Sequence, residues 1–200
     1  MILVATVIAW LVVEIAGFSD LVAVLGGFIP ARVSGLADIP GAVPVFLTPL
    51  TATLIHGGAL HLGFNMLMLG YCGKLLEMAV GSKGIVLIYV VGAYAAALFQ
   101  FLGDPNSPVP MIGASGAVSA VVGAYSLLYG SRRQIGRSGK RVSHWGQVLW
   151  LAAAWTLVQL LIGLATHGTG VGIAIGAHIG GFVAGLLLAR PLLVRRARGL

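Results

Sequence analysis

The chain has 200 residues, of which 58% are hydrophobic and 8% are charged, and its formal net charge at pH 7 is +7. A soluble domain usually carries about 25% charged residues, so this composition excludes an ordinary soluble protein and predicts an integral membrane protein. Long apolar runs exclude the alternating pattern of an outer-membrane barrel. The basic residues gather at the ends of these runs, which fits membrane topology better than nucleic-acid binding.

Six apolar segments follow one another along the chain, each close to the length of about 20 residues that a membrane-spanning helix needs. The first has no basic residues before it, so we expect a membrane helix there and no cleavable signal peptide. The sequence therefore predicts an all-α membrane protein, a bundle of six transmembrane helices in one domain over residues 1–200. The predicted helices are 2–20, 59–79, 84–102, 113–130, 147–166 and 171–189.

The long first connection, residues 21–58, is too apolar for a water-exposed loop and too rich in proline for a clean membrane span. We expect it to lie partly in the membrane interface. The connection 165–172, between the fifth and sixth segments, is rich in glycine. We expect that it caps a site at this end of the bundle and can move aside.

The positions of the twelve Lys and Arg residues predict the orientation. With six spans, eleven of them fall on the side that holds both termini, and only Arg32 falls on the other side. The positive-inside rule then places both termini in the cytoplasm, and we expect a multi-pass protein of a prokaryotic inner membrane. The eleven are Lys74, Lys83, Arg132, Arg133, Arg137, Lys140, Arg141, Arg190, Arg195, Arg196 and Arg198.

Polar residues from three segments fall at a similar depth, near the outer side. His61 and Asn65 are four residues apart, so they share one face of the second segment. Ser115 lies at the outer start of the fourth segment, and His178 lies seven residues into the sixth, about 10 Å deep at 1.5 Å per residue. Polar groups inside a membrane are costly and usually functional. This coincidence predicts a catalytic site that opens to the outer side.

Each of these features alone has a simpler explanation. The segment GASGA (113–117) more often serves close packing of membrane helices, and His56 could be interfacial. Trp150 and Trp155 of the fifth segment could contact lipid or substrate, or anchor the helix in the interface. The single cysteine, Cys72, and the histidines do not suggest a metal site, and we expect no cofactor.

Three motifs, in this order and spacing, identify a likeness to a known family. They are HGGALHLGFNM (56–66), GASG (113–116) and AHIGGFVAG (177–185). The chain resembles the rhomboid intramembrane serine proteases over nearly its whole length. The resemblance implies that Ser115 is the nucleophile and His178 its general base. It also implies an oxyanion hole made by His61, Asn65 and the backbone N–H of Ser115, with supporting roles for Gly113, Gly116, Ser119, His56 and Gly181.

A third catalytic residue is not expected, because no Asp or Glu follows Asp104 in the chain. We therefore predict a Ser–His dyad in place of a triad. Many rhomboids carry a Tyr where this chain has Ser119, and we expect that the Ser119 hydroxyl, or a bound water, helps to position His178. Leu47 and Thr48 stand where the family often has a Trp-Arg pair.

The predicted function is that of a single transmembrane protease domain, an intramembrane serine endopeptidase. It would hydrolyse a peptide bond in or near the transmembrane helix of single-span or multi-span membrane protein substrates, within the lipid bilayer and without nucleic acid. Two alternatives are a catalytically inactive rhomboid-like scaffold and a small transporter. The presence of both Ser115 and His178 argues against the first. The location of the polar groups near one face, away from the midplane, argues against the second.

Overall fold

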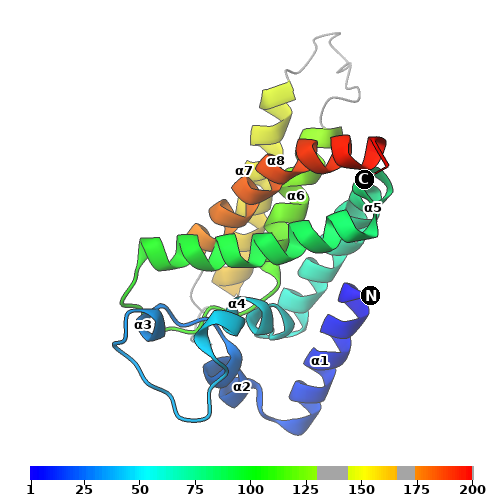
Figure 1. Ribbon diagram of the computed structural model, residues 1–200. Coiled ribbons are helices and arrows are strands. Elements are labelled where there is room, and N and C mark those ends of the chain that lie inside the picture. Colours follow the sequence, from blue (N-terminus) through cyan, green and yellow to red (C-terminus); the bar gives the residue numbers. More distant parts are fainter. Residues whose placement is uncertain (130–143, 166–173, 200) are drawn as a thin grey trace.

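The structure is a computed structural model, and it describes residues 1–129, 144–165 and 174–199 (Figure 1). The described part is helical and holds no strand, apart from an isolated antiparallel bridge between Phe28 and Met111. Its elements are α1 (Ile2–Ala16), α2 (Ser19–Gly26), α3 (Pro30–Val33), the 3-10 turn η1 (Val45–Leu47), α4 (Thr48–Thr51), the 3-10 turn η2 (Ala52–Leu54), α5 (Ala59–Gly103), α6 (Ser115–Tyr129), α7 (His144–Ala165) and α8 (Ile175–Ala197).

The first helix ends earlier than the predicted segment 2–20. Gly17 adopts a left-handed conformation, with φ 71°, and its N–H bonds to the carbonyl of Glu14. Glycine accepts this conformation without a Cβ penalty, so it stops the helix and a new one, α2, begins at Ser19. The rest of the first connection holds the short helical turns α3, η1, α4 and η2, with a stretch of irregular chain over residues 34–44.

The second and third predicted segments are the two arms of α5. Helical geometry is interrupted at Gly81, where φ is 77° and ψ is 167°. Figure 1 shows the chain changing direction there, so that the arm before Gly81 and the arm after it run along different lines. The predicted break between residues 79 and 84 is therefore a sharp bend at one glycine and not a loop.

The last three helices differ from the prediction only at their ends. Helix α6 begins at Ser115 because Gly113, with φ 106°, is not helical. Helix α7 starts three residues before the predicted segment. Helix α8 continues past residue 189 and through Pro191 to Ala197. The predicted start of the last segment, residues 171–173, lies outside the described residues, as does most of the connection 165–172.

Apolar surface dominates the outside of the described helices. Two of these helices, α5 and α8, are long and apolar enough to cross a membrane, and α1, α6 and residues 146–158 of α7 are shorter apolar helices. Large apolar side chains such as Val12, Leu67 and Leu187 are exposed. A surface of this kind suits contact with lipid.

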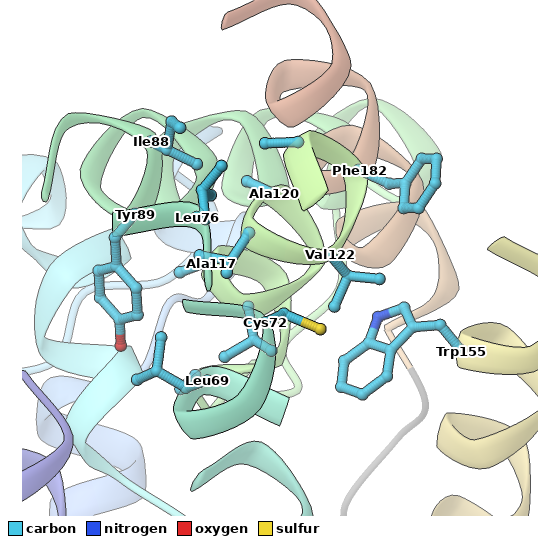
Figure 2. Close-up of a cluster of buried hydrophobic side chains, with 14 of the residues drawn as sticks. Leu69, Cys72, Leu76, Ile88, Tyr89, Ala117, Ala120, Val122, Trp155 and Phe182 are labelled. Carbon is cyan, nitrogen blue, oxygen red and sulfur yellow. The ribbon is translucent and has the colours of Figure 1, made fainter. Parts of the chain in front are cut away.

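Helix α6 forms the centre of the described structure. It packs against both α5 and α8, which also pack against each other. Figure 2 shows the buried cluster between these helices, with Ala117, Ala120 and Val122 of α6 among Leu76, Ile88 and Phe182. Small residues bring the backbones together: a Cβ added to Gly185 would lie 1.9 Å from the carbonyl oxygen of Ala120. Such contact leaves no room for a larger side chain.

Candidate active site

Ser115 and His178 meet between α6 and α8. The Oγ of Ser115 lies 3.0 Å from Nε2 of His178, although the two residues are 63 positions apart in the chain. Both side chains are buried, with 8% of Ser115 and 7% of His178 exposed. This is the hydrogen-bond distance at which a histidine can take a proton from a serine hydroxyl.

Glycines create the close approach that this contact needs. A Cβ on Gly181, one turn after His178, would lie 2.0 Å from the carbonyl oxygen of Gly116. A Cβ on Gly116 would lie 2.4 Å from the Cβ of Ala96 on α5. Both predicted supporting glycines therefore lie where helices touch. Gly181 allows α8 to approach α6 closely, and Gly116 allows α6 to approach α5.

The other ring nitrogen of His178, Nδ1, is buried and has no hydrogen-bond partner within the described residues. In particular, no carboxylate from the described part of the chain bonds to it. A neutral imidazole with its proton on Nδ1 leaves Nε2 free to accept the Ser115 hydroxyl proton. The geometry therefore suits transfer of a proton between Ser115 and His178, and no described residue bonds to Nδ1 to orient the ring.

Ser119 has partners that the sequence did not suggest. Its hydroxyl donates to the backbone carbonyl of Ser115 at 2.7 Å, and its oxygen accepts the indole N–H of Trp155 at 2.7 Å. No direct hydrogen bond joins it to His178 among the described residues, so a role of Ser119 in positioning that histidine, directly or through a water, stays a prediction. Sequence reasoning did not anticipate the contact with Trp155, for which the only signal was a tryptophan inside an apolar run.

His56 supports the turn that precedes Ser115. Its Nε2 accepts the backbone N–H of Ala114 at 3.3 Å. Burial, together with repulsion from a charge on His61, lowers the pKa of His56 to about 3. The ring is therefore neutral near pH 7, which leaves Nε2 unprotonated and able to accept this bond.

His61 lies on the other side of the same turn. Its ring is 5.1 Å from that of His56, and a Cβ on Gly113 would lie 2.6 Å from its Nε2. The positive φ of Gly113 and this contact both require glycine at that position. Asn65 is fully buried one turn further along α5, where its Nδ2 donates to the carbonyl of His61 at 2.8 Å and its Oδ1 has no partner among the described residues. His56 and His61 thus contact the turn 113–114 that leads to Ser115, and Asn65 bonds to the backbone of His61.

Two cavities adjoin the site. The one lined by Ser115 measures about 10 Å³, about the space of a single water-sized probe, and Thr53, Gly113 and Ala177 also line it. A larger cavity, of about 320 Å³, is lined by His56, Ile112 and polar residues of the first two helices, among them Glu14, Ser19 and Asp20. Ile112 lines both. Ser115 is therefore covered in this structure, and the larger cavity begins on the other side of Ile112.

Leu47 and Thr48, which replace the Trp-Arg pair, lie in the turns before α5. Thr48 is buried and its hydroxyl donates to the carbonyl of Val45 at 2.7 Å, while the Leu47 side chain is exposed. Leu47 thus presents apolar surface at this point.

Comparison with known proteins agrees with these motifs. Residues 44–195 match the Rhomboid domain family. The chain is 32% identical over 152 residues to RHOMBOID-like protein 4 of Arabidopsis thaliana, which covers 73% of this chain and 34% of that protein. It is 31% identical over 143 residues to Rhomboid protease GluP of Bacillus subtilis, covering 72% of this chain and 25% of that protein.

A further relative is Rhomboid protease GlpG of an Enterobacter species, with 32% identity over 140 residues that cover 70% of this chain and 46% of that protein. The chain thus spans less than half the length of these relatives. The family match covers most of the chain and includes every residue of the site described above. The chain belongs to the rhomboid family.

Proposed function

We propose that this protein is an intramembrane serine endopeptidase that cleaves a peptide bond in or near the transmembrane helix of membrane protein substrates. The observation that carries the proposal is the 3.0 Å contact between Ser115 Oγ and His178 Nε2 in a buried site. Similarity to relatives named rhomboid proteases supports it. The presence of both Ser115 and His178 argues against an inactive scaffold. The position of the polar groups near one face, away from the midplane, argues against a transporter.

In this mechanism Ser115 Oγ attacks the carbonyl carbon of the substrate while His178 Nε2 takes the hydroxyl proton. The tetrahedral intermediate carries a negative charge on its oxygen. Ser115 is the first residue of α6, where backbone N–H groups have no carbonyl partner in the helix and favour an anion. His178 then gives its proton to the leaving amine, and water, activated by the same histidine, releases the acyl group.

The side chains proposed to complete the oxyanion hole are His61 and Asn65. His61 is already placed against Gly113, two residues before the nucleophile. Removal of one such donor costs about 2.7–4 kcal/mol in a well-studied serine enzyme. Asn65 holds the carbonyl of His61, so part of its contribution is to fix the position of that residue.

A substrate needs more space than the small cavity beside Ser115 provides. We propose that the protein must open beside Ser115 to admit it, and that water comes from the larger cavity next to His56. Because an intact helix shields its peptide bonds, helix-breaking residues in the substrate should favour cleavage.

The test is labelling by a fluorophosphonate probe together with cleavage of single-span proteins in liposomes. Wild type should be labelled, and Ser115→Ala and His178→Ala should abolish both labelling and cleavage. Ser126→Ala is a matched control, since Ser126 is another buried serine of α6 whose hydroxyl bonds to a backbone carbonyl. It should keep both. Folded wild type that neither reacts nor cleaves would instead support the inactive scaffold.

We also propose six membrane spans, formed by α1, the two arms of α5, α6, α7 and α8, with both termini in the cytoplasm. The distribution of Lys and Arg supports this orientation. Because Cys72 is the single cysteine and is buried, new cysteines can be labelled selectively. Asn106→Cys and Arg198→Cys should react with impermeant reagents from opposite sides of the membrane. Labelling of both from the same side contradicts the proposed topology.

A further inference from the structure

Helix α7 is attached to the rest of the protein differently from the other long helices. It packs mainly against α6 and only weakly against α8. Many of its described side chains are exposed, including Leu149, Trp150 and Leu157. Val148 and Trp155, seven residues apart and so on one face, are the buried exceptions among its described side chains.

Trp155 is the larger of these two buried side chains. Only 3% of it is exposed, and Figure 2 shows its indole reaching from α7 toward Cys72 and Val122 in the core cluster. A buried indole N–H needs an acceptor. Here the acceptor is the hydroxyl of Ser119, one turn after the nucleophile on α6.

The Ser119 hydroxyl has a single proton, which it donates to the backbone carbonyl of Ser115. Accepting the indole N–H makes a hydroxyl a better donor, because hydrogen bonds in a chain polarise one another. The Ser119 side chain also has little room to move, since a Cβ added to the facing Gly181 would lie 3.2 Å from the Cβ of Ser119. A continuous chain of hydrogen bonds thus leads from α7 to the residue whose Oγ contacts His178.

We propose that Trp155 is a positioning residue: through Ser119 it holds the first turn of α6, and therefore the Ser115 hydroxyl, in place for reaction. This inference rests on the proposed function. It also means that the nucleophile is fully ordered only while α7 is docked on α6, so that the docking of α7 and the reactivity of Ser115 are linked.

Trp155→Phe in the full chain tests this, because phenylalanine keeps an aromatic ring and removes the N–H donor. The rate constant for fluorophosphonate labelling of Ser115, and kcat for a transmembrane substrate, should each fall roughly tenfold, as expected for loss of a buried hydrogen bond, with KM little changed. Ser119→Ala should have a similar effect. In the double variant the labelling rate constant and kcat should fall no further than in the more affected single variant, since both changes break the same chain of hydrogen bonds.

Trp150→Phe is the matched control, because Trp150 is on the same helix and 69% exposed. It should label and cleave like wild type. If Trp155→Phe labels at the wild-type rate, the proposal is wrong. It is equally wrong if the variant only reduces the fraction of protein that can be labelled, with an unchanged rate for each intact site. If wild type itself is not labelled at Ser115, the proposed function fails and this inference fails with it.

Discussion

Helix α6 contacts α8 and α7 in two different ways. Against α8, glycines bring backbone onto backbone, and the Ser115–His178 contact lies in that seam. Against α7, the described contact is made by side chains, mainly the buried Val148 and Trp155, with the partly buried Ala152 also packed on the core. The first kind of contact allows almost no adjustment. The second depends on interlocking side chains, which can repack more easily, so we expect changes on the α8 side of α6 to be more damaging than changes on the α7 side.

The largest effect should come from adding a methyl group to the α6–α8 seam. Gly181→Ala places a Cβ 2.0 Å from the carbonyl oxygen of Gly116, which forces the helices apart. We expect a loss of about 3 kcal/mol of unfolding free energy, at the upper end of the usual cost of overpacking because the clash is with backbone, and loss of labelling at Ser115. Thermal unfolding in detergent and fluorophosphonate labelling measure the two effects.

Gly63→Ala is the matched control, since Gly63 is also in a helix but has open space around it. Its stability should be unchanged or slightly higher. Equal behaviour of the two variants would show that the α6–α8 seam is not close-packed.

The next effect concerns the turn before the nucleophile. Gly113→Ala introduces a Cβ at φ 106° and 2.6 Å from the ring of His61, so it displaces a proposed oxyanion donor. We expect cleavage to fall about 100-fold, as for loss of one such donor, with a stability loss of about 2 kcal/mol.

Gly58→Ala separates the effect of backbone strain from the effect of contact with His61. Gly58 has φ 138°, but no atom lies within 4 Å of the added Cβ. It should lower stability through backbone strain and leave more of the activity. A similar loss of activity in both variants would point to strain in the backbone and remove the argument for contact with His61.

The α6–α7 contact should respond more weakly. Val148→Ala removes two methyl groups from a buried site, and we expect a loss of about 1–2 kcal/mol in thermal unfolding. The neighbouring Leu149 is exposed, so Leu149→Ala should change stability by less than about 0.5 kcal/mol. If Val148→Ala were as damaging as Gly181→Ala, the contrast between the two sides of α6 would be lost.

The smallest effect is a dependence of stability on pH through His56. Its pKa is about 3 in the folded protein and near the ordinary 6.5 when unfolded, so the unfolded chain binds more protons between these values. Stability should therefore fall as pH falls below 6.5, by less than about 1 kcal/mol between pH 7 and pH 6. His56→Gln, which can still accept the N–H of Ala114 but does not titrate, should flatten this part of the profile. An unchanged slope would show that His56 is not its source.

Much of this description could be predicted from the sequence. Composition and apolar runs predicted a helical membrane protein, since both depend on local properties of the chain. The depth of Ser115 and His178 in their segments predicted that they would meet, because helix rise converts residue number into height. The described structure places the two side chains in contact, as that reasoning expected.

The sequence could not predict which side chains of different helices would contact one another, because no rule of residue spacing connects separate helices. Whether Ser119 faces His178 or Trp155 depends on the rotation and crossing of α6, α7 and α8, which helical periodicity leaves undetermined. The end of α1 at Gly17 and the bend at Gly81 likewise depend on backbone conformations that glycine permits but does not require.

The sequence by itself thus determined the helical class, the order of the motifs and the residues proposed to carry the chemistry. Only the tertiary structure decided how closely α6 approaches α8, which side chains pack α7 on the core, and that Ser115 is buried. The physical reason is that periodicity is a property of neighbouring residues. Packing distance depends on every side chain in the interface, and these come from distant parts of the chain.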